Sequence, residues 1–127
     1  MRSITISVNP DWKAQLRNSA ARVKTGVESG EYQGEYLTYS SYADMARDFT
    51  EGRIQILRQM LHAGTVGVRE LSRRLDRGVR RVHDDSQALV ALGLLEKTED
   101  GALECPFEHI HVHADFELTP AGVLQAA

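Results

Sequence analysis

Residues 68–95 read VRELSRRLDRGVRRVHDDSQALVALGLL, and this stretch decides the fold that we expect. Its apolar residues recur at helical spacing on both sides of Asp76-Arg77-Gly78, and aspartate and glycine are typical turn residues. The spacing predicts a short helix over 68–75 and a longer helix over 79–92. The longer helix is expected to bury one face made of Val79, Val82, Ser86, Leu89 and Val90.

The segments on either side of this helix pair complete a predicted domain. Before the pair, Thr50 is a candidate N-cap for a further helix. That helix is expected to turn Ile54, Leu57, Met60 and Leu61 inward and Arg53 and Arg58 outward. After the pair, residues 94–105 read as a strand, an Asp-Gly turn and a second strand. A helix pair followed directly by a β-hairpin is the order of elements in a winged helix-turn-helix, which we expect over residues 50–127.

Residues 1–49 are not required for such a domain and form a separate extension. The expected elements are a strand over 4–8, a helix from Pro10, a glycine-rich linker over 26–34, a strand over 35–39 and a helix capped by Ser40 or Ser41. The chain is therefore predicted to be α+β, with a winged helix-turn-helix core and an N-terminal β-α-β-α extension. The extension can serve either as a dimerisation surface or as a binding surface for a partner protein, and the sequence does not choose between them.

Arginine is concentrated on the predicted helix pair. Residues 68–81 contain six arginines against two acids, Glu70 and Asp76, a local charge of +4 in a chain whose net charge is −3. An acidic protein that gathers its arginines in one place generally sets them against a polyanion, so double-stranded DNA is the partner that we expect. The residues expected to contact DNA are Arg69, Arg73, Arg74, Arg77, Arg80, Arg81, Asp84, Gln87 and Lys97.

Two kinds of contact are expected from these residues. Arg80 and Arg81 lie near the start of the second helix, the part that meets base edges in helix-turn-helix proteins, and Asp84 and Gln87 follow one and two turns later. The remaining arginines are expected to hold phosphates, and Lys97 belongs to the predicted wing. The alternative is a solvated face on which the arginines pair with nearby acids. Asp85 is expected to orient a neighbouring arginine, because a carboxylate repels phosphate.

The helix pair resembles the helix-turn-helix of MarR-like transcriptional regulators. Most of the chain is also similar to a family of small prokaryotic winged-helix proteins that are DNA-binding proteins or transcriptional regulators. The matching segments are ITI at 4–6, GEYLTY at 34–39, FTEGRIQIL at 49–57, VRELSRRL at 68–75, VRRVHDDSQAL at 79–89, TEDG at 98–101 and PFEHIHV at 106–112. The chain departs from the family pattern at Gly67, Ser72 and Ser86, none of which lies on the charged face. Some members of that family resemble antitoxins that repress their own operon, so the resemblance implies such a role, with a toxin as partner.

Other kinds of chemistry find little support in the sequence. There is no G-x-x-x-x-G-K phosphate loop, no G-x-S-x-G motif and no H-E-x-x-H motif, so neither an enzyme nor a bound cofactor is expected. His109, His111 and His113 alternate along a predicted strand, and imidazoles at this spacing can ligate zinc. Because no second group of ligands accompanies them, the solvent face of an edge strand is the favoured interpretation, and no metal site is expected.

The sequence also predicts a cytoplasmic location. Cys105 is the only cysteine, so no internal disulfide can form, which suits a reducing compartment. No apolar run approaches the ~18 residues of a membrane span, and the first residues lack the apolar core of a signal peptide.

Two hypotheses follow. The first is a sequence-specific, homodimeric repressor, with the autoregulating antitoxin of a toxin–antitoxin operon as one form of it. The alternative is an interaction module whose winged helix and N-terminal extension bind and neutralise a partner protein.

Overall fold

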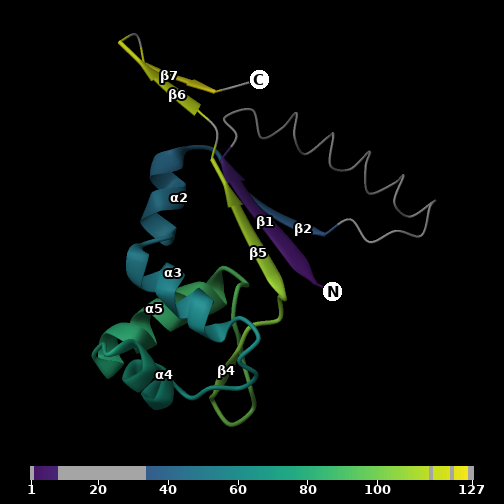
Figure 1. Ribbon diagram of the computed structural model, residues 1–127, viewed down its shortest axis with the longest axis vertical. Coiled ribbons are helices and arrows are strands. Elements are labelled where there is room, and N and C mark those ends of the chain that lie inside the picture. The colour runs from purple at the N-terminus through teal and green to yellow at the C-terminus, as the bar shows by residue number, and fades with distance from the viewer. Residues whose placement is uncertain (1, 9–33, 115, 121, 126–127) are drawn as a thin grey trace, which may run out of the picture. The chain divides into compact units, whose positions relative to one another are not determined.

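The computed structural model describes residues 2–8, 34–114, 116–120 and 122–125. Within them the elements follow in the order β1 (Ser3–Val8), β2 (Glu35–Tyr39), α2 (Tyr42–Asp48), α3 (Glu51–Met60), α4 (Val68–Leu75), α5 (Val79–Ala91), β3 (Glu96–Lys97), β4 (Leu103–Glu104), β5 (His109–His113), β6 (Phe116–Thr119) and β7 (Gly122–Gln125) (Figure 1). The chain is α+β, as predicted. The helix expected from Pro10 and nearly all of the expected linker lie outside the described residues.

The chain divides into two compact units. The helical unit consists of Met1–Arg2 and Ala46–His109, and the sheet unit consists of Ser3–Met45 and Ile110–Ala127. The expected division placed residues 50–127 in one domain. In the structure β5 belongs to the same sheet as β1, which places the residues after His109 with the N-terminal strands.

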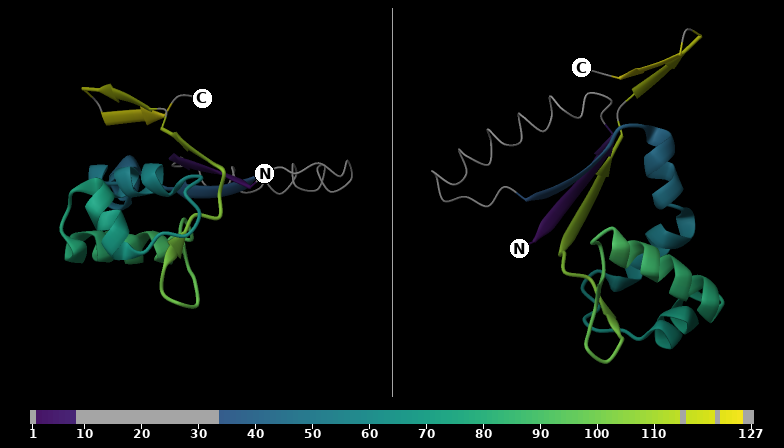
Figure 2. Two further views of the ribbon diagram at one scale, coloured as in Figure 1. Left: turned by 60° about the horizontal axis from the view of Figure 1, so that its bottom comes forward. Right: turned by 180° about the vertical axis from the view of Figure 1, so that it is seen from behind.

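The sheet unit contains a three-stranded sheet in the order β2-β1-β5. Strands β1 and β2 pair in parallel, with a register that runs from Ile4 opposite Glu35 to Val8 opposite Tyr39. The right view of Figure 2 shows the three strands side by side. Because β1 is the central strand, Ile4, Ile6 and Val8 are buried. A separate antiparallel hairpin, β6–β7, follows β5.

The helical unit has an apolar core to which α3, α4 and α5 contribute; the ribbon of these helices is drawn in Figure 1. Its buried apolar residues include Ile56, Leu57, Met60, Val66, Leu71, Val82, Leu89, Leu94, Leu95, Leu103 and Phe107. Strands β3 and β4 form a short antiparallel hairpin directly after α5. Val66, in the segment between α3 and α4, exchanges two backbone hydrogen bonds of 2.8 Å with Leu103 of β4. This pairing fixes the hairpin to the segment that enters α4.

Three expected orientations are wrong. The buried face of α3 is centred on Ile56, Leu57 and Met60, so Ile54 is exposed and Arg53, expected to point outward, is partly buried. The rotation follows from Ile56, which is fully buried and lies nearly half a helical turn away from Ile54. Val79, which was expected to be buried, is 43% exposed because it is the first residue of α5 and lies next to the turn between α4 and α5.

Candidate nucleic-acid interface

The turn between α4 and α5 holds the two helices in place. Asp76 takes the left-handed conformation at φ 53°, and its N–H and that of Arg77 reach back to the end of α4. The buried hydroxyl of Ser72 donates a hydrogen bond to the carbonyl oxygen of Arg77. The family resemblance implies a small apolar residue at position 72. The serine instead satisfies a backbone acceptor in the turn, so this departure has a structural reason.

Helix α5 buries one side and exposes the other. Val82, Ser86 and Leu89 are buried against the rest of the helical unit. Arg80, Arg81 and Asp84 are exposed, and we call these three residues the α5 face. Helical spacing in the sequence predicted this division for all six residues.

Arg80 and Arg81 occupy the first turn of α5, and both are exposed. Within the described residues neither side chain makes a hydrogen bond or an ion pair. The unpaired N–H groups at a helix N-terminus carry a partial positive charge, which adds to that of the guanidinium groups. The start of α5 therefore presents free cationic donors to solvent.

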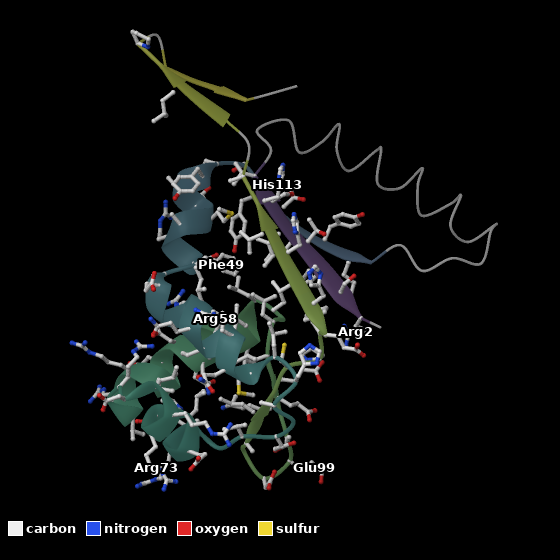
Figure 3. The ribbon with its side chains drawn as sticks, viewed as in Figure 1. Arg2, Phe49, Arg58, Arg73, Glu99 and His113 are labelled. Carbon is white, nitrogen blue, oxygen red and sulfur yellow. The ribbon has the colours of Figure 1, made fainter. Side chains whose placement is uncertain are left out.

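The arginines of α4 differ in their pairing. Arg73 forms an ion pair with Glu70, and the Nε of Arg74 lies 3.2 Å from the other carboxylate oxygen of Glu70. The side chain of Arg73 is 78% exposed and points away from the helices (Figure 3). Arg69, one helical turn earlier, is exposed as well. Because exposed ion pairs contribute only about 0–1 kcal/mol, an incoming phosphate can replace Glu70 as the partner of either arginine.

Arg77 is placed quite differently. Its Nη2 lies 2.8 Å from Oδ2 of Asp85, and its Nη1 donates to the carbonyl oxygen of Gly52 at 3.3 Å. Arg53 occupies the other carboxylate oxygen of Asp85, with Nε 3.2 Å from Oδ1, and it also donates to the carbonyl of Asp48 at 3.1 Å. The three side chains, which we call the Asp85 cluster, join α3, the turn and α5.

The Asp85 cluster is mostly enclosed, and its electrostatics follow from that. Exposed fractions are 20% for the Asp85 side chain, 21% for Arg53 and 23% for Arg77. Burial by itself raises the pKa of Asp85, but the hydrogen bonds and charges of Arg77 and Arg53 outweigh it and bring the pKa below its ordinary value of 3.8. Asp85 therefore orients arginines, as expected. A DNA contact by Arg77 stays a prediction. Its guanidinium group would have to make that contact although it already binds Asp85 and the carbonyl oxygen of Gly52.

The other three expected contacts lie in different surroundings. Asp84 is 71% exposed on α5, 3.6 Å from the imidazole of His83. Gln87 is half-buried, and its Nε2 is enclosed without a hydrogen-bond partner among the described residues. Lys97 is exposed at the end of β3, directly before the turn of the hairpin. Of the three, Asp84 and Lys97 reach solvent directly, whereas the amide nitrogen of Gln87 must turn outward to contact a base.

The tip of the β3–β4 hairpin is acidic. Thr98 donates a hydrogen bond to Asp100, and this bond lowers the pKa of that carboxyl. Glu99 lies beside it at the end of the hairpin (Figure 3). Both acids are exposed and carry negative charge at neutral pH. The acids of the hairpin repel phosphate, so Lys97 is the residue of this hairpin whose charge suits a contact with DNA.

A polar hollow that the sequence did not predict lies between α3 and α4. It has a volume of about 380 Å³ and is lined by Gln55, Arg58, Gln59, Arg74 and Leu75. Its α3 side comes from residues spaced three and four apart, so they share one face of that helix. That spacing, together with the outward orientation of Arg58, is the signal by which sequence reasoning could have found the α3 wall.

The chain belongs to the HVO_A0114 family. The family model matches residues 48–112, just over half of the 127-residue chain. No curated protein and no solved structure matches the chain. The HVO_A0114 match runs from the last residue of α2 into β5, so it contains the helix pair, the Asp85 cluster, the polar hollow and the hairpin.

The histidine strand lies at the end of the HVO_A0114 match. His109, His111 and His113 are all exposed on β5, and the rings of His111 and His113 stack with centroids 6.1 Å apart. Among the described residues there is no group of three or more His, Cys, Asp or Glu side chains that could hold a metal ion.

Burial raises the pKa of the Cys105 thiol. In the part of the chain that the structure describes, no helix is long and apolar enough to cross a membrane.

Proposed function

We propose that the helical unit is a winged helix-turn-helix and that this protein is a sequence-specific, homodimeric DNA-binding repressor in the cytoplasm. The autoregulating antitoxin of a toxin–antitoxin operon is one form of this proposal. The order of elements supports the fold: α3, the strand-like Val66, α4, α5 and then the β3–β4 hairpin, with Val66 paired to β4. The resemblance of the helix pair to MarR-like regulators supports it independently.

The single observation that carries the function is the pair of free guanidinium groups at the start of α5. In the rest of the helix pair, most arginines have a partner within the protein: Arg73 and Arg74 pair with Glu70, and Arg77 pairs with Asp85. Arg80 and Arg81 have no such partner among the described residues. Two adjacent unpaired cations do not stabilise the fold, so their presence favours a role in binding. A guanidinium that is exposed, unpaired and at a helix N-terminus is suited to bind an anion or a guanine edge.

The residues then take distinct roles in the proposal. Helix α5 enters the major groove, where Arg80 and Arg81 each offer a planar pair of donors to guanine. Asp84 accepts from cytosine one turn later. Arg69, Arg73, Arg74 and Lys97 bind phosphates of the two DNA strands. Arg73 and Arg74 exchange their ion pairs with Glu70 for these phosphates. Arg77 positions α5 through Asp85.

A homodimer is part of the proposal because one α5 reads only a short sequence. Two copies related by a two-fold axis present two α5 helices to half-sites about one helical turn of DNA apart. We propose that residues of the sheet unit form the dimer interface. The winged helix-turn-helix that we propose for the helical unit is complete without them, so they are available for this role. If a toxin is a partner, the same unit is the proposed surface for it.

The test is equilibrium binding to the DNA upstream of the gene that encodes this protein, measured by fluorescence anisotropy at several salt concentrations. The wild type is expected to bind one site with an affinity that falls steeply with salt. Arg80→Ala with Arg81→Ala is expected to weaken specific binding at least about a hundredfold, because each guanine contact discriminates by roughly 1–3 kcal/mol.

A charge-matched control separates base reading from simple attraction. Arg80→Lys with Arg81→Lys keeps both positive charges but lacks the planar pair of donors. This variant is expected to retain non-specific affinity while losing most of the preference for the specific site. If the alanine variant bound the specific site as tightly as the wild type, α5 would not be the recognition helix. Absence of any DNA binding, with a neighbouring gene product that co-purifies, would favour the interaction-module alternative.

A further inference from the structure

The polar hollow between α3 and α4 is separate from the α5 face. Gln55, Arg58 and Gln59 of α3 form one wall, and Arg74 and Leu75 of α4 form the other. All five residues belong to the helical unit, and α3 and α4 are packed against each other. Figure 3 shows Arg58 on α3 and, well apart from it, Arg73 at the outer end of α4. The walls are therefore two neighbouring helices of one unit, whose placement does not depend on the sheet unit.

The walls supply mainly hydrogen-bond donors. Arg58 and Gln59 make no hydrogen bond to other described residues, and Arg74 uses only its Nε, toward Glu70 at 3.2 Å. The amide of Gln55 donates to Glu51 at 3.4 Å. No carboxylate lines the hollow itself, but Glu51 and Glu70 are the hydrogen-bond partners of lining residues. The charge that remains unpaired is that of Arg58, and the terminal amino groups of Arg74 add further donors.

The remaining surface of the hollow is apolar. Leu75 is half-buried and contributes to its lining, and the methylene stems of the arginines and glutamines add more apolar surface. A volume of about 380 Å³ falls at the lower end of the range for ligand sites, roughly 300–1,000 Å³. An isolated inorganic ion would leave most of this space filled with water.

We infer that the polar hollow binds a small organic anion. A phosphate or carboxylate group contacts Arg58 and Arg74, both of which can donate two parallel hydrogen bonds to it. The glutamine amides contact the remaining oxygens, and the organic body lies on Leu75. The same chemistry has two sources, a free metabolite or the backbone phosphate and sugar of DNA, and the experiment below distinguishes them. The site shares Arg74 with the proposed phosphate contacts, but it goes beyond the proposed recognition of DNA by α5 and does not depend on it.

The direct test uses phenyl phosphate as the probe and contains no DNA. Amide and arginine side-chain NMR signals of the full-length protein are followed during the titration at constant ionic strength, with sodium chloride as the matched salt. Saturable shifts are expected in the second half of α3 and at the end of α4. Arg58→Gln and Arg74→Gln are each expected to weaken binding about tenfold, because each removes a charged pair of donors.

Arg73→Gln is the matched control, since Arg73 is the sequence neighbour of Arg74 on α4 but does not line the hollow. It removes the same charge and is expected to leave the affinity for phenyl phosphate within about twofold. Circular dichroism confirms that each variant is folded. Shifts that do not saturate, shifts equal to those caused by chloride, or equal effects of Arg73→Gln and Arg74→Gln would overturn the inference.

Adding a DNA duplex then identifies the source. If the duplex displaces phenyl phosphate and Arg58→Gln weakens DNA binding, the hollow holds a backbone phosphate of DNA. If phenyl phosphate stays bound in the presence of the duplex, the natural ligand is a free small anion. A protein that binds no DNA but still binds phenyl phosphate at Arg58 and Arg74 would refute the proposed repressor and leave this site standing.

Discussion

Replacing Asp85 by asparagine tests whether the Asp85 cluster holds α5 in place. The substitution keeps the size of the side chain but removes the negative charge between two guanidinium groups, at 3.2 Å from Arg53 and 2.8 Å from Arg77. Two positive charges then share a partly enclosed space without a counter-charge. Arg53 and Arg77 bind different oxygens of the carboxylate, and asparagine replaces one of these oxygens by an NH2 donor, so one arginine loses its partner on α5.

The magnitude follows from the burial of the three side chains. Breaking a fully buried ion pair costs roughly 3–5 kcal/mol, whereas an exposed pair is worth about 0–1 kcal/mol. The three side chains are 20–23% exposed, so solvent screens the cluster in part, and we expect the free energy of unfolding to fall by about 2 kcal/mol. For a chain of this size that corresponds to a melting temperature lower by roughly 8 °C.

The assay is urea unfolding at pH 7 followed by circular dichroism, with Asp84→Asn as the control. Asp84 is the preceding residue of α5 and is 71% exposed, so its substitution is expected to change stability by less than about 0.5 kcal/mol. A loss below about 0.5 kcal/mol in Asp85→Asn, or an equal loss in both variants, would refute the reasoning.

The pH dependence gives a second check on the same variant. Because the pKa of Asp85 is lowered in the folded protein, its contribution is fully present above the unfolded value near 3.8 and is lost as the pH falls through the folded value. The difference between wild type and Asp85→Asn is therefore expected to be constant from pH 5 to pH 7 and to shrink in more acidic solution. A difference that persists unchanged in strong acid would show that the charge of Asp85 is not its cause.

Three further predictions concern other parts of the helical unit. Gly52→Ala is expected to lower the free energy of unfolding, measured in urea, by up to about 1 kcal/mol, because an added Cβ would lie 2.8 Å from Nη1 of Arg77. In the Asp85→Asn background the same substitution is expected to be neutral or stabilising, because there alanine only improves helix propensity. Glu70→Gln is expected to raise affinity for DNA severalfold at low salt by freeing two arginines, and a decrease in anisotropy titrations would contradict this. Leu89→Ala is expected to cost about 3 kcal/mol in urea unfolding, since the leucine is fully buried, and a loss under 1 kcal/mol would mean that the site collapses around the smaller residue.

Most of the elements of the helical unit could be predicted from sequence because their signals are local. Thr50 caps α3 through its hydroxyl, which accepts a hydrogen bond from the N–H of Arg53 at 3.3 Å, and the helix pair begins at Val68 and Val79 as spacing predicts. The orientation of α3 could not be predicted equally well. Its sequence offers Ile54 and Ile56 as rival centres of the inner face, and only packing against α4 and α5 decides between them.

The pairing of charges was the main part of the site that spacing could not provide. Asp85 and Arg53 are 32 residues apart in the sequence, so no helical rule brings them together. The pairs of Glu70 with Arg73 and Arg74, at three and four residues, follow the helical rule and were predictable as the solvated alternative. The parallel pairing of β1 with β2, and the membership of β5 in their sheet, also depend on contacts between distant segments.

The six arginines of residues 68–81 look equivalent in sequence, but the structure separates them by what each one contacts. The internal pair of Arg77 with Asp85 connects the turn between α4 and α5 to α5, and Arg53 connects the same carboxylate to α3. This arrangement fixes the direction of α5 without using Arg80 or Arg81. Two cations can then remain unpaired at the start of a rigid helix in a chain whose net charge is −3. Because binding groups on a rigid helix lose less entropy on binding than groups on a mobile one, we expect the enclosed Arg77 to contribute indirectly to the anion affinity that we propose for Arg80 and Arg81.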